Sequence, residues 1–160
     1  MPFNYEYPSN LYMKLTDKER LKREKRLFRE SVRKDKAKIK RENKSFPKKA
    51  DDLWSKVVRK VWACAVCWKK ENLNAHHIFT RHNKSTRWDL DNGICLCSWC
   101  HVFSDKFSAH KTPTDFTYWL EKQYSREWLE TLGRKANTPL HIDSEYLKAT
   151  IIYLKSLLNE

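Results

Sequence analysis

Two pairs of cysteines have the spacing of a zinc site. Two residues separate Cys64 from Cys67 and Cys97 from Cys100, and 29 residues lie between the pairs. The thiolates of one Cys-x-x-Cys turn can occupy two corners of a tetrahedron, and a second turn completes it. Four thiolates leave no open position on the ion, so the sequence predicts a structural Zn²⁺ bound by all four cysteines. The fifth cysteine, Cys95, is expected to be a small buried residue, with a competing role as ligand left open.

A second group of residues suits the hydrolysis of a phosphodiester. His76, His77 and Asn92 lie between the cysteine pairs, and His101 follows Cys100 directly. This hydrolysis needs a base that activates water and a cation that stabilises charge on the phosphate and the leaving oxygen. It also needs a proton for the departing alkoxide. Histidine can act as the base or as a metal ligand. The group can therefore supply both a general base and metal ligands for such a reaction.

In this order, and interleaved with both cysteine pairs, these residues resemble the HNH endonuclease family. The resemblance covers roughly residues 60–110. It implies a ββα-metal fold held by the two zinc knuckles, in which His77 at the end of the first strand is the general base. It also implies that Asn92 orients the loop carrying His77 and does not touch the substrate.

Three residues are expected to bind the catalytic metal. His76 points away from His77 in a regular strand, as a ligand must while His77 faces the water. His101 begins the following helix, and Asp105 lies four residues later on the same helical face, although a solvated acid explains Asp105 equally well. His110 stays open as a ligand or phosphate contact. The expected catalytic ion is Mg²⁺ or Mn²⁺; Ni²⁺ and Zn²⁺ also suit imidazole ligands.

The charge of the chain points to a polyanionic partner. The net charge is +13, and residues 14–44 hold 15 Lys/Arg against 6 Asp/Glu. Proteins this basic usually bind phosphates, because each one neutralised releases counterions. Residues 14–44 are therefore predicted to be an arm that tracks DNA, with a solvated helix or a disordered tail as the alternative. Nearer the histidines, Arg81, Lys84 and Arg87 are expected to contact phosphates from the loop between the two strands.

The expected fold class is α+β. A ββα-metal core with a structural zinc knuckle is flanked by a long basic N-terminal helix and two C-terminal helices. The parts are a basic arm, helical or partly disordered, over residues 1–50, the zinc-stapled nuclease core over residues 51–111, and a C-terminal helical hairpin over residues 112–160. The sequence has no apolar run of membrane-spanning length and no secretory leader pattern over residues 1–13, so a soluble cytoplasmic protein is expected, with phage or mobile-element origin plausible.

The helix boundaries follow from local signals. Residues 45–47, which include a proline, are expected to end the long basic helix, and Asp51 or Asp52 to begin the next one. A further helix is predicted from Thr112 to Gly133, since threonine is a good N-cap and glycine a good stop. The last helix is expected to begin at Asp143 or Ser144.

These observations together predict a metal-dependent DNA endonuclease that cuts one strand per active site. The order of the elements is also similar to that of phage recombination nucleases of the NinG (Rap) type, which act on branched DNA. Two alternatives are a homing or nicking endonuclease on linear duplex DNA and a non-catalytic zinc-containing DNA-binding module. The sequence leaves the oligomeric state open.

Overall fold

The structure is a computed structural model that describes residues 17–159. The part of the predicted arm before residue 17 lies outside the described residues. The chain divides into two units at Glu42 and Asn43. In the first unit, residues 17–42 are all helical and, apart from half-buried Val32, exposed. The second unit holds the remaining elements and the candidate site.

Helix α1 (Asp17–Arg59) continues through Pro47, so the predicted break at residues 45–47 is wrong. Proline removes one backbone donor from a helix, but tertiary packing can offset that loss. Here Phe46 and Ala50, on either side of the proline, both pack into a core together with Trp54. Asp51, expected to begin a new helix, lies inside α1 instead.

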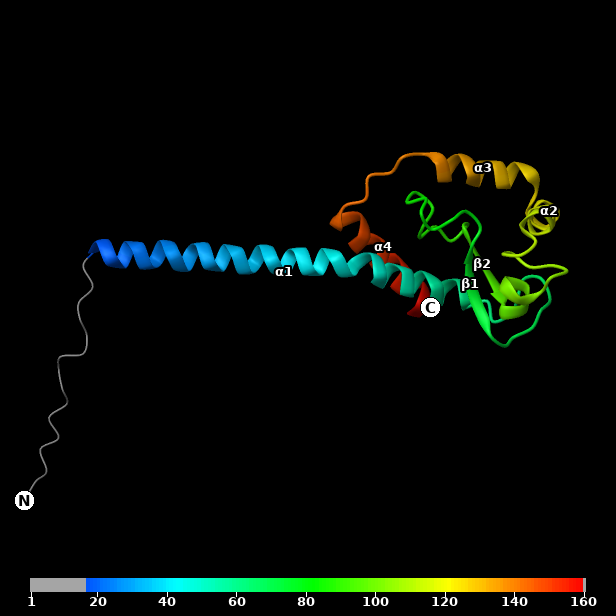
Figure 1. Ribbon diagram of the computed structural model, residues 1–160, viewed down its shortest axis with the longest axis horizontal. Helices are drawn as coiled ribbons and strands as arrows, with labels where there is room; N and C mark the ends of the chain where they lie inside the picture. Colours follow the sequence, from blue (N-terminus) through cyan, green and yellow to red (C-terminus); the bar gives the residue numbers. More distant parts are fainter. Residues whose placement is uncertain (1–16, 160) are drawn as a thin grey trace, which may run out of the picture. The chain divides into compact units, whose positions relative to one another are not determined.

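The centre of the second unit is an antiparallel hairpin. Strand β1 (Leu73–His77) pairs with β2 (Gly93–Cys97), and His77 lies opposite Gly93. The short π-helical turn η1 (Trp99–Phe103) follows β2 (Figure 1). A Cβ atom on Gly93 would lie 2.5 Å from Cγ2 of Val58 and 2.8 Å from Cζ2 of Trp54. Glycine at this position therefore permits α1 to pack against the end of the hairpin.

Three helices, not the expected two, follow the hairpin: α2 (Pro113–Tyr124), α3 (Arg126–Asn137) and α4 (Ser144–Asn159). The chain turns at Ser125, whose φ of 101° ends α2, and its hydroxyl accepts a hydrogen bond from the backbone N–H of Trp128 at the start of α3. Gly133 does not stop a helix; it lies within α3, where an added Cβ would be 3.2 Å from the Phe79 ring.

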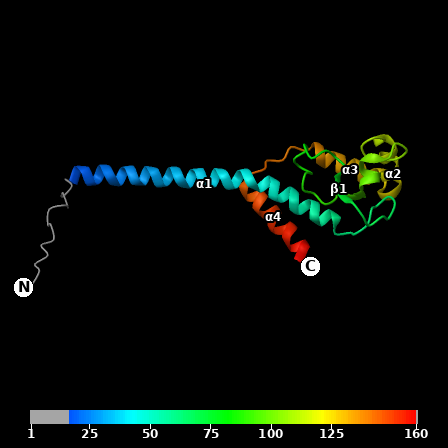
Figure 2. The ribbon, with the colours of Figure 1, turned by 60° about the horizontal axis from the view of Figure 1, so that its bottom comes forward.

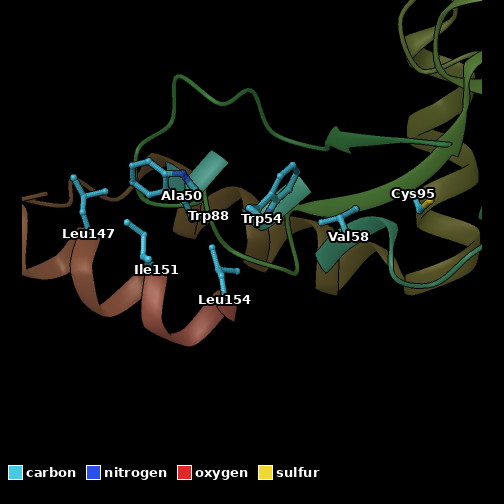
Figure 3. Packing of buried hydrophobic residues seen from close by; sticks show 8 residues of the cluster. All are labelled: Ala50, Trp54, Val58, Trp88, Cys95, Leu147, Ile151 and Leu154. Atoms are coloured by element: carbon cyan, nitrogen blue, oxygen red, sulfur yellow. The ribbon is translucent and has the colours of Figure 1, made fainter. Parts of the chain in front are cut away.

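Two apolar clusters hold the second unit together. In the first, Trp54 and Val58 of α1 pack with Leu147, Ile151 and Leu154 of α4 (Figure 3). Both ribbon views show α4 beside the C-terminal part of α1 (Figure 2). The second cluster joins β2 and η1 to α2. This mixture of helices around a two-stranded sheet confirms the α+β class. Within residues 17–159, none of the helices has the length and apolarity needed to cross a membrane.

Candidate functional site

The four paired cysteines come together. Their sulfur atoms all lie within 4.8 Å of one another, and Sγ of Cys67 is 3.5 Å from Sγ of Cys97. Zn–S bonds of about 2.3 Å in a tetrahedron separate neighbouring sulfurs by roughly 3.8 Å. Cys64, Cys97 and Cys100 are buried, whereas Cys67 is exposed. The cluster can therefore hold a zinc ion, as the sequence predicts.

The environment of Cys64 favours its thiolate. Burial alone raises the pKa of its thiol, but backbone N–H groups of Cys97, Cys67 and Val66 outweigh burial and bring the pKa to about 7. Burial raises the pKa of the Cys100 thiol, and the charge of a bound cation would favour its thiolate.

The fifth cysteine is part of the core. Cys95 is 3% exposed and packs in the first apolar cluster, with Trp54 and Val58. Burial raises the pKa of its thiol. Its position agrees with the expected small buried residue.

Three histidines form a second cluster that can hold a metal. The ligand nitrogens of His76, His101 and His110 all lie within 4.8 Å of one another. Ring centroids are 5.1 Å apart for His76 and His101, 5.1 Å for His76 and His110, and 4.7 Å for His101 and His110. The Nε2 atoms of His101 and His110 are 3.2 Å apart. The Phe116 ring packs edge-on against His76 at 5.4 Å and forms one wall of the cluster.

Asp105 lies outside this cluster, contrary to its predicted place as third ligand. The prediction relied on a helix that continues for a full turn after His101, but η1 ends at Phe103 and Ser104 is extended. The Asp105 side chain is 86% exposed, and its carboxylate pairs with Nζ of Lys111 at 2.6 Å. The alternative reading of Asp105 as a solvated acid fits this position.

His110 supplies the third imidazole of the cluster because two backbone hydrogen bonds bring the chain back against η1. The N–H of Ala109 donates to the carbonyl of Cys100 at 3.0 Å, and the N–H of His110 donates to the carbonyl of His101 at 3.2 Å. These two bonds bring the chain back against η1 and align the two histidines. The sequence marked His110 only as an open candidate, because a nine-residue separation has no regular helical or strand geometry.

The cluster favours neutral imidazoles. Burial lowers the pKa of His76 to about 3, with further contributions from His101 and His110. Burial also lowers the pKa of His101. A metal binds the neutral ring, so protons compete with it only in acid. Three imidazole nitrogens suit Zn²⁺ or Ni²⁺ best and Mn²⁺ less well, whereas Mg²⁺ prefers oxygen ligands.

His77 lies beside this cluster but has different partners. Its ring stacks on Trp54 of α1, with centroids 3.8 Å apart and an interplanar angle of 13°. Its Nε2 is 2.9 Å from the carbonyl oxygen of Arg87. Since a carbonyl only accepts, Nε2 carries the proton and Nδ1 keeps a free lone pair. Burial lowers the pKa of His77, although the hydrogen bond to Arg87 opposes the shift.

Asn92 binds both ends of the loop between the strands through hydrogen bonds. Its side chain is fully buried, and its Oδ1 accepts the N–H of Phe79 at 2.6 Å. Its Nδ2 donates to the carbonyls of Phe79 at 2.9 Å and Thr86 at 3.0 Å. The Asn92 carbonyl also accepts the N–H of Ile78 at 2.9 Å. Asn92 thus holds both ends of the segment from residue 78 to residue 86, and this segment leads directly to Arg87, whose carbonyl binds His77.

The three predicted phosphate contacts lie in different surroundings. Arg81 is exposed and lines a cleft of about 650 Å³ together with His77 and the three clustered histidines. Lys84 is exposed but lines a separate hollow beside the end of α3. Arg87 donates from Nε and Nη2 to the two carboxylate oxygens of Asp51, at 2.9 and 2.6 Å. The structure thus places Arg87 in an internal ion pair and not at the cleft.

Comparison with known proteins is consistent with this geometry. Residues 63–110 match the family model described as HNH endonuclease. The match spans both cysteine pairs and all four histidines of the cleft, and it supports a nuclease domain that acts on DNA. No curated protein and no solved structure matches the chain. The narrower resemblance to NinG-type nucleases therefore stays a prediction.

Proposed function

We propose that this chain is a metal-dependent DNA endonuclease that hydrolyses one phosphodiester bond per active site, with His77 as general base. The observation that carries the proposal is the hydrogen bond from Nε2 of His77 to the Arg87 carbonyl. This bond leaves Nδ1 free to accept a proton from water, in a cleft that also contains three histidines able to bind a cation.

The proposed roles divide between the two sides of the cleft. A divalent cation held by His76, His101 and His110 would stabilise charge on the scissile phosphate and the leaving oxygen. His77 takes the proton of the attacking water, and the water oxygen bonds to phosphorus as the bond to the 3′-oxygen breaks. The leaving 3′-oxygen takes a proton from solvent. Asn92 positions the loop behind His77. Arg81 would contact a phosphate, and its exposed position at the same cleft supports this role.

The proposed metal preference follows from the ligands. With His110 in place of Asp105, the cluster contains no carboxylate. We therefore expect Mn²⁺, Ni²⁺ or Zn²⁺ to support cleavage better than Mg²⁺.

The test is conversion of supercoiled plasmid to open circles with each metal and with EDTA. His77→Ala should lower the nicking rate by about 10²–10⁴, the usual contribution of a general base. The matched control is His141→Ala, because His141 is exposed and lies outside the cleft. DNA binding and zinc content should survive in both variants. Nicking by His77→Ala at the wild-type rate would exclude the proposed base, and binding without cleavage by the wild type would favour a binding module. Four-way junctions and linear duplexes compared in the same assay test the branched-DNA preference.

Helix α1 supplies a second proposed DNA contact. Lys22, Arg26, Arg29, Arg33 and Lys40 recur at intervals of three, four or seven residues, which places them on one side of the helix, and all are exposed. No acidic residue interrupts this side between residues 22 and 40. We propose that it follows the phosphates of a duplex.

Replacing these five residues by glutamine should flatten the salt dependence of DNA binding. Each lost phosphate contact removes roughly 0.9 from the slope of log K against log salt concentration. The control replaces five basic residues of the opposite side, which also carries Glu30: Arg20, Arg23, Lys34, Lys38 and Arg41. Equal losses in the two variants would indicate an effect of net charge, and an unchanged slope in both would exclude the arm from DNA.

A further inference from the structure

An apolar stripe runs along the first unit. Leu21, Phe28, Val32 and Ile39 follow one another at intervals of seven, four and seven residues. At about 3.6 residues per turn, these intervals correspond to two turns, one turn and two turns, so the four side chains share one face. Leu21 is 51%, Phe28 70% and Ile39 56% exposed.

The described part of this unit cannot bury the stripe by itself. Residues 17–42 form one continuous helix, and a single helix has no second surface against which its own face can pack. A helix with an apolar stripe at regular spacing normally places that stripe against a partner. The chemistry of that partner can be inferred from the residues at the edges of the stripe.

The two edges of the stripe carry opposite charges at the same positions along the helix axis. Asp17, Glu24 and Asp35 lie along one edge, and each is followed directly by a lysine. Because consecutive residues are about 100° apart around a helix, those lysines, at positions 18, 25 and 36, lie along the other edge. The stripe thus has an acidic edge and a basic edge, with an acid and a lysine at each of three levels.

This arrangement is complementary to itself in one orientation. When two helices pair in parallel, the acidic edge of each faces the basic edge of the other, so each acid lies opposite a lysine of the second helix. In an antiparallel pair, like edges meet and the charges repel. We propose that the apolar stripe binds a second copy of this chain, parallel and in register, with Asp17, Glu24 and Asp35 facing lysines of the second helix.

Sedimentation equilibrium of the full, zinc-loaded chain over a concentration series tests the proposal. No DNA is present, so the result is independent of the proposed nuclease activity. The average mass should rise from that of the 19.4 kDa monomer toward twice that value. Phe28→Asp should weaken association at least about tenfold, because each copy loses a large buried apolar side chain. The control is Leu27→Asp, since Leu27 is 50% exposed but points away from the stripe.

Charge variants test the orientation. Glu24→Lys alone and Lys25→Glu alone should each weaken self-association, because like charges then meet at that level. The double variant, and an equimolar mixture of the two single variants, should both restore it. A monomer at every concentration up to about 1 mM would overturn the proposal and leave the stripe to residues 1–16 or another partner. Equal effects of Phe28→Asp and Leu27→Asp would overturn it as well, and so would a failure of the mixture to associate.

Discussion

Arg87→Ala distinguishes a structural role for this arginine from the predicted contact with DNA. Two hydrogen bonds join its guanidinium to the Asp51 carboxylate, at 2.9 and 2.6 Å. The carboxylate also accepts a hydrogen bond from the Trp88 indole at 2.8 Å. Removal of Arg87 therefore leaves a partly buried carboxylate with one of its three donors.

The magnitude follows from the exposure and the geometry of the pair. The Arg87 and Asp51 side chains are 25% and 28% exposed, so solvent screens the pair only in part. Exposed ion pairs contribute about 0–1 kcal/mol, and charge-assisted bonds in the interior about 1.5–3 kcal/mol. Arg87 also lies 5.1 Å from the centre of the Trp88 ring, which adds about 0.5 kcal/mol. We expect Arg87→Ala to lower the free energy of unfolding by about 2 kcal/mol.

Thermal unfolding of the metal-loaded protein measures this loss. For a unit of this size, about 2 kcal/mol corresponds to a decrease in Tm of roughly 8 °C. Lys84→Ala, at an exposed position of the same loop, is the control and should change Tm by less than about 2 °C. The salt dependence of DNA binding, measured well below Tm, should be unchanged in Arg87→Ala. A wild-type Tm combined with a slope smaller by about 0.9 would refute the structural role and restore the phosphate contact.

Three further perturbations have expected outcomes. Gly93→Ala should lower the free energy of unfolding by about 1–3 kcal/mol in chemical denaturation, because its Cβ would overlap Val58 and Trp54; unchanged stability would contradict that packing. His110→Ala should weaken binding of Mn²⁺ or Ni²⁺ at least about tenfold by calorimetry, whereas Asp105→Ala should leave it unchanged; the opposite order would restore Asp105 as the ligand. Burial lowers the pKa of His77 below the usual 6.5, so the ring stays in its base form to a lower pH. The nicking rate at saturating metal should therefore fall only as the pH drops through that lowered pKa. A fall centred at or above pH 6.5 would contradict the assignment of His77 as the base.

The cysteine site was predictable because its spacing is local. A Cys-x-x-Cys turn fixes two sulfurs over a few bonds, so two such turns identify a tetrahedral site before the fold is known. The hairpin was expected from the resemblance to the HNH family, which implies a ββα core, and in the structure His77 ends one strand and Cys97 the other. The family resemblance then joined these local patterns into one α+β core, and the family match over residues 63–110 supports it.

The errors arose where distant residues decide the outcome. Pro47 is a local stop signal, but α1 passes through it because Ala50 and Trp54 pack on α4, about a hundred residues away. Gly133 is another local stop signal, overridden by close packing on Phe79. Asp105 lies outside the histidine cluster because η1 is too short to preserve helical spacing from His101. Nothing in the sequence showed that Arg87 would pair with Asp51 across 36 positions.

The same ion pair connects the fold to the proposed chemistry. Asp51 of α1 binds the Arg87 side chain, and the Arg87 carbonyl accepts a hydrogen bond from Nε2 of His77. Trp54, one helical turn after Asp51, stacks on the face of the His77 ring. Two residues of one helix thus hold the His77 ring, Trp54 by stacking on it and Asp51 through Arg87, whose carbonyl binds Nε2. This explains why adjacent histidines of one strand can have different roles. The His76 ring is surrounded by other imidazoles and suits a metal, whereas the His77 ring is held by a carbonyl and an indole and suits a proton.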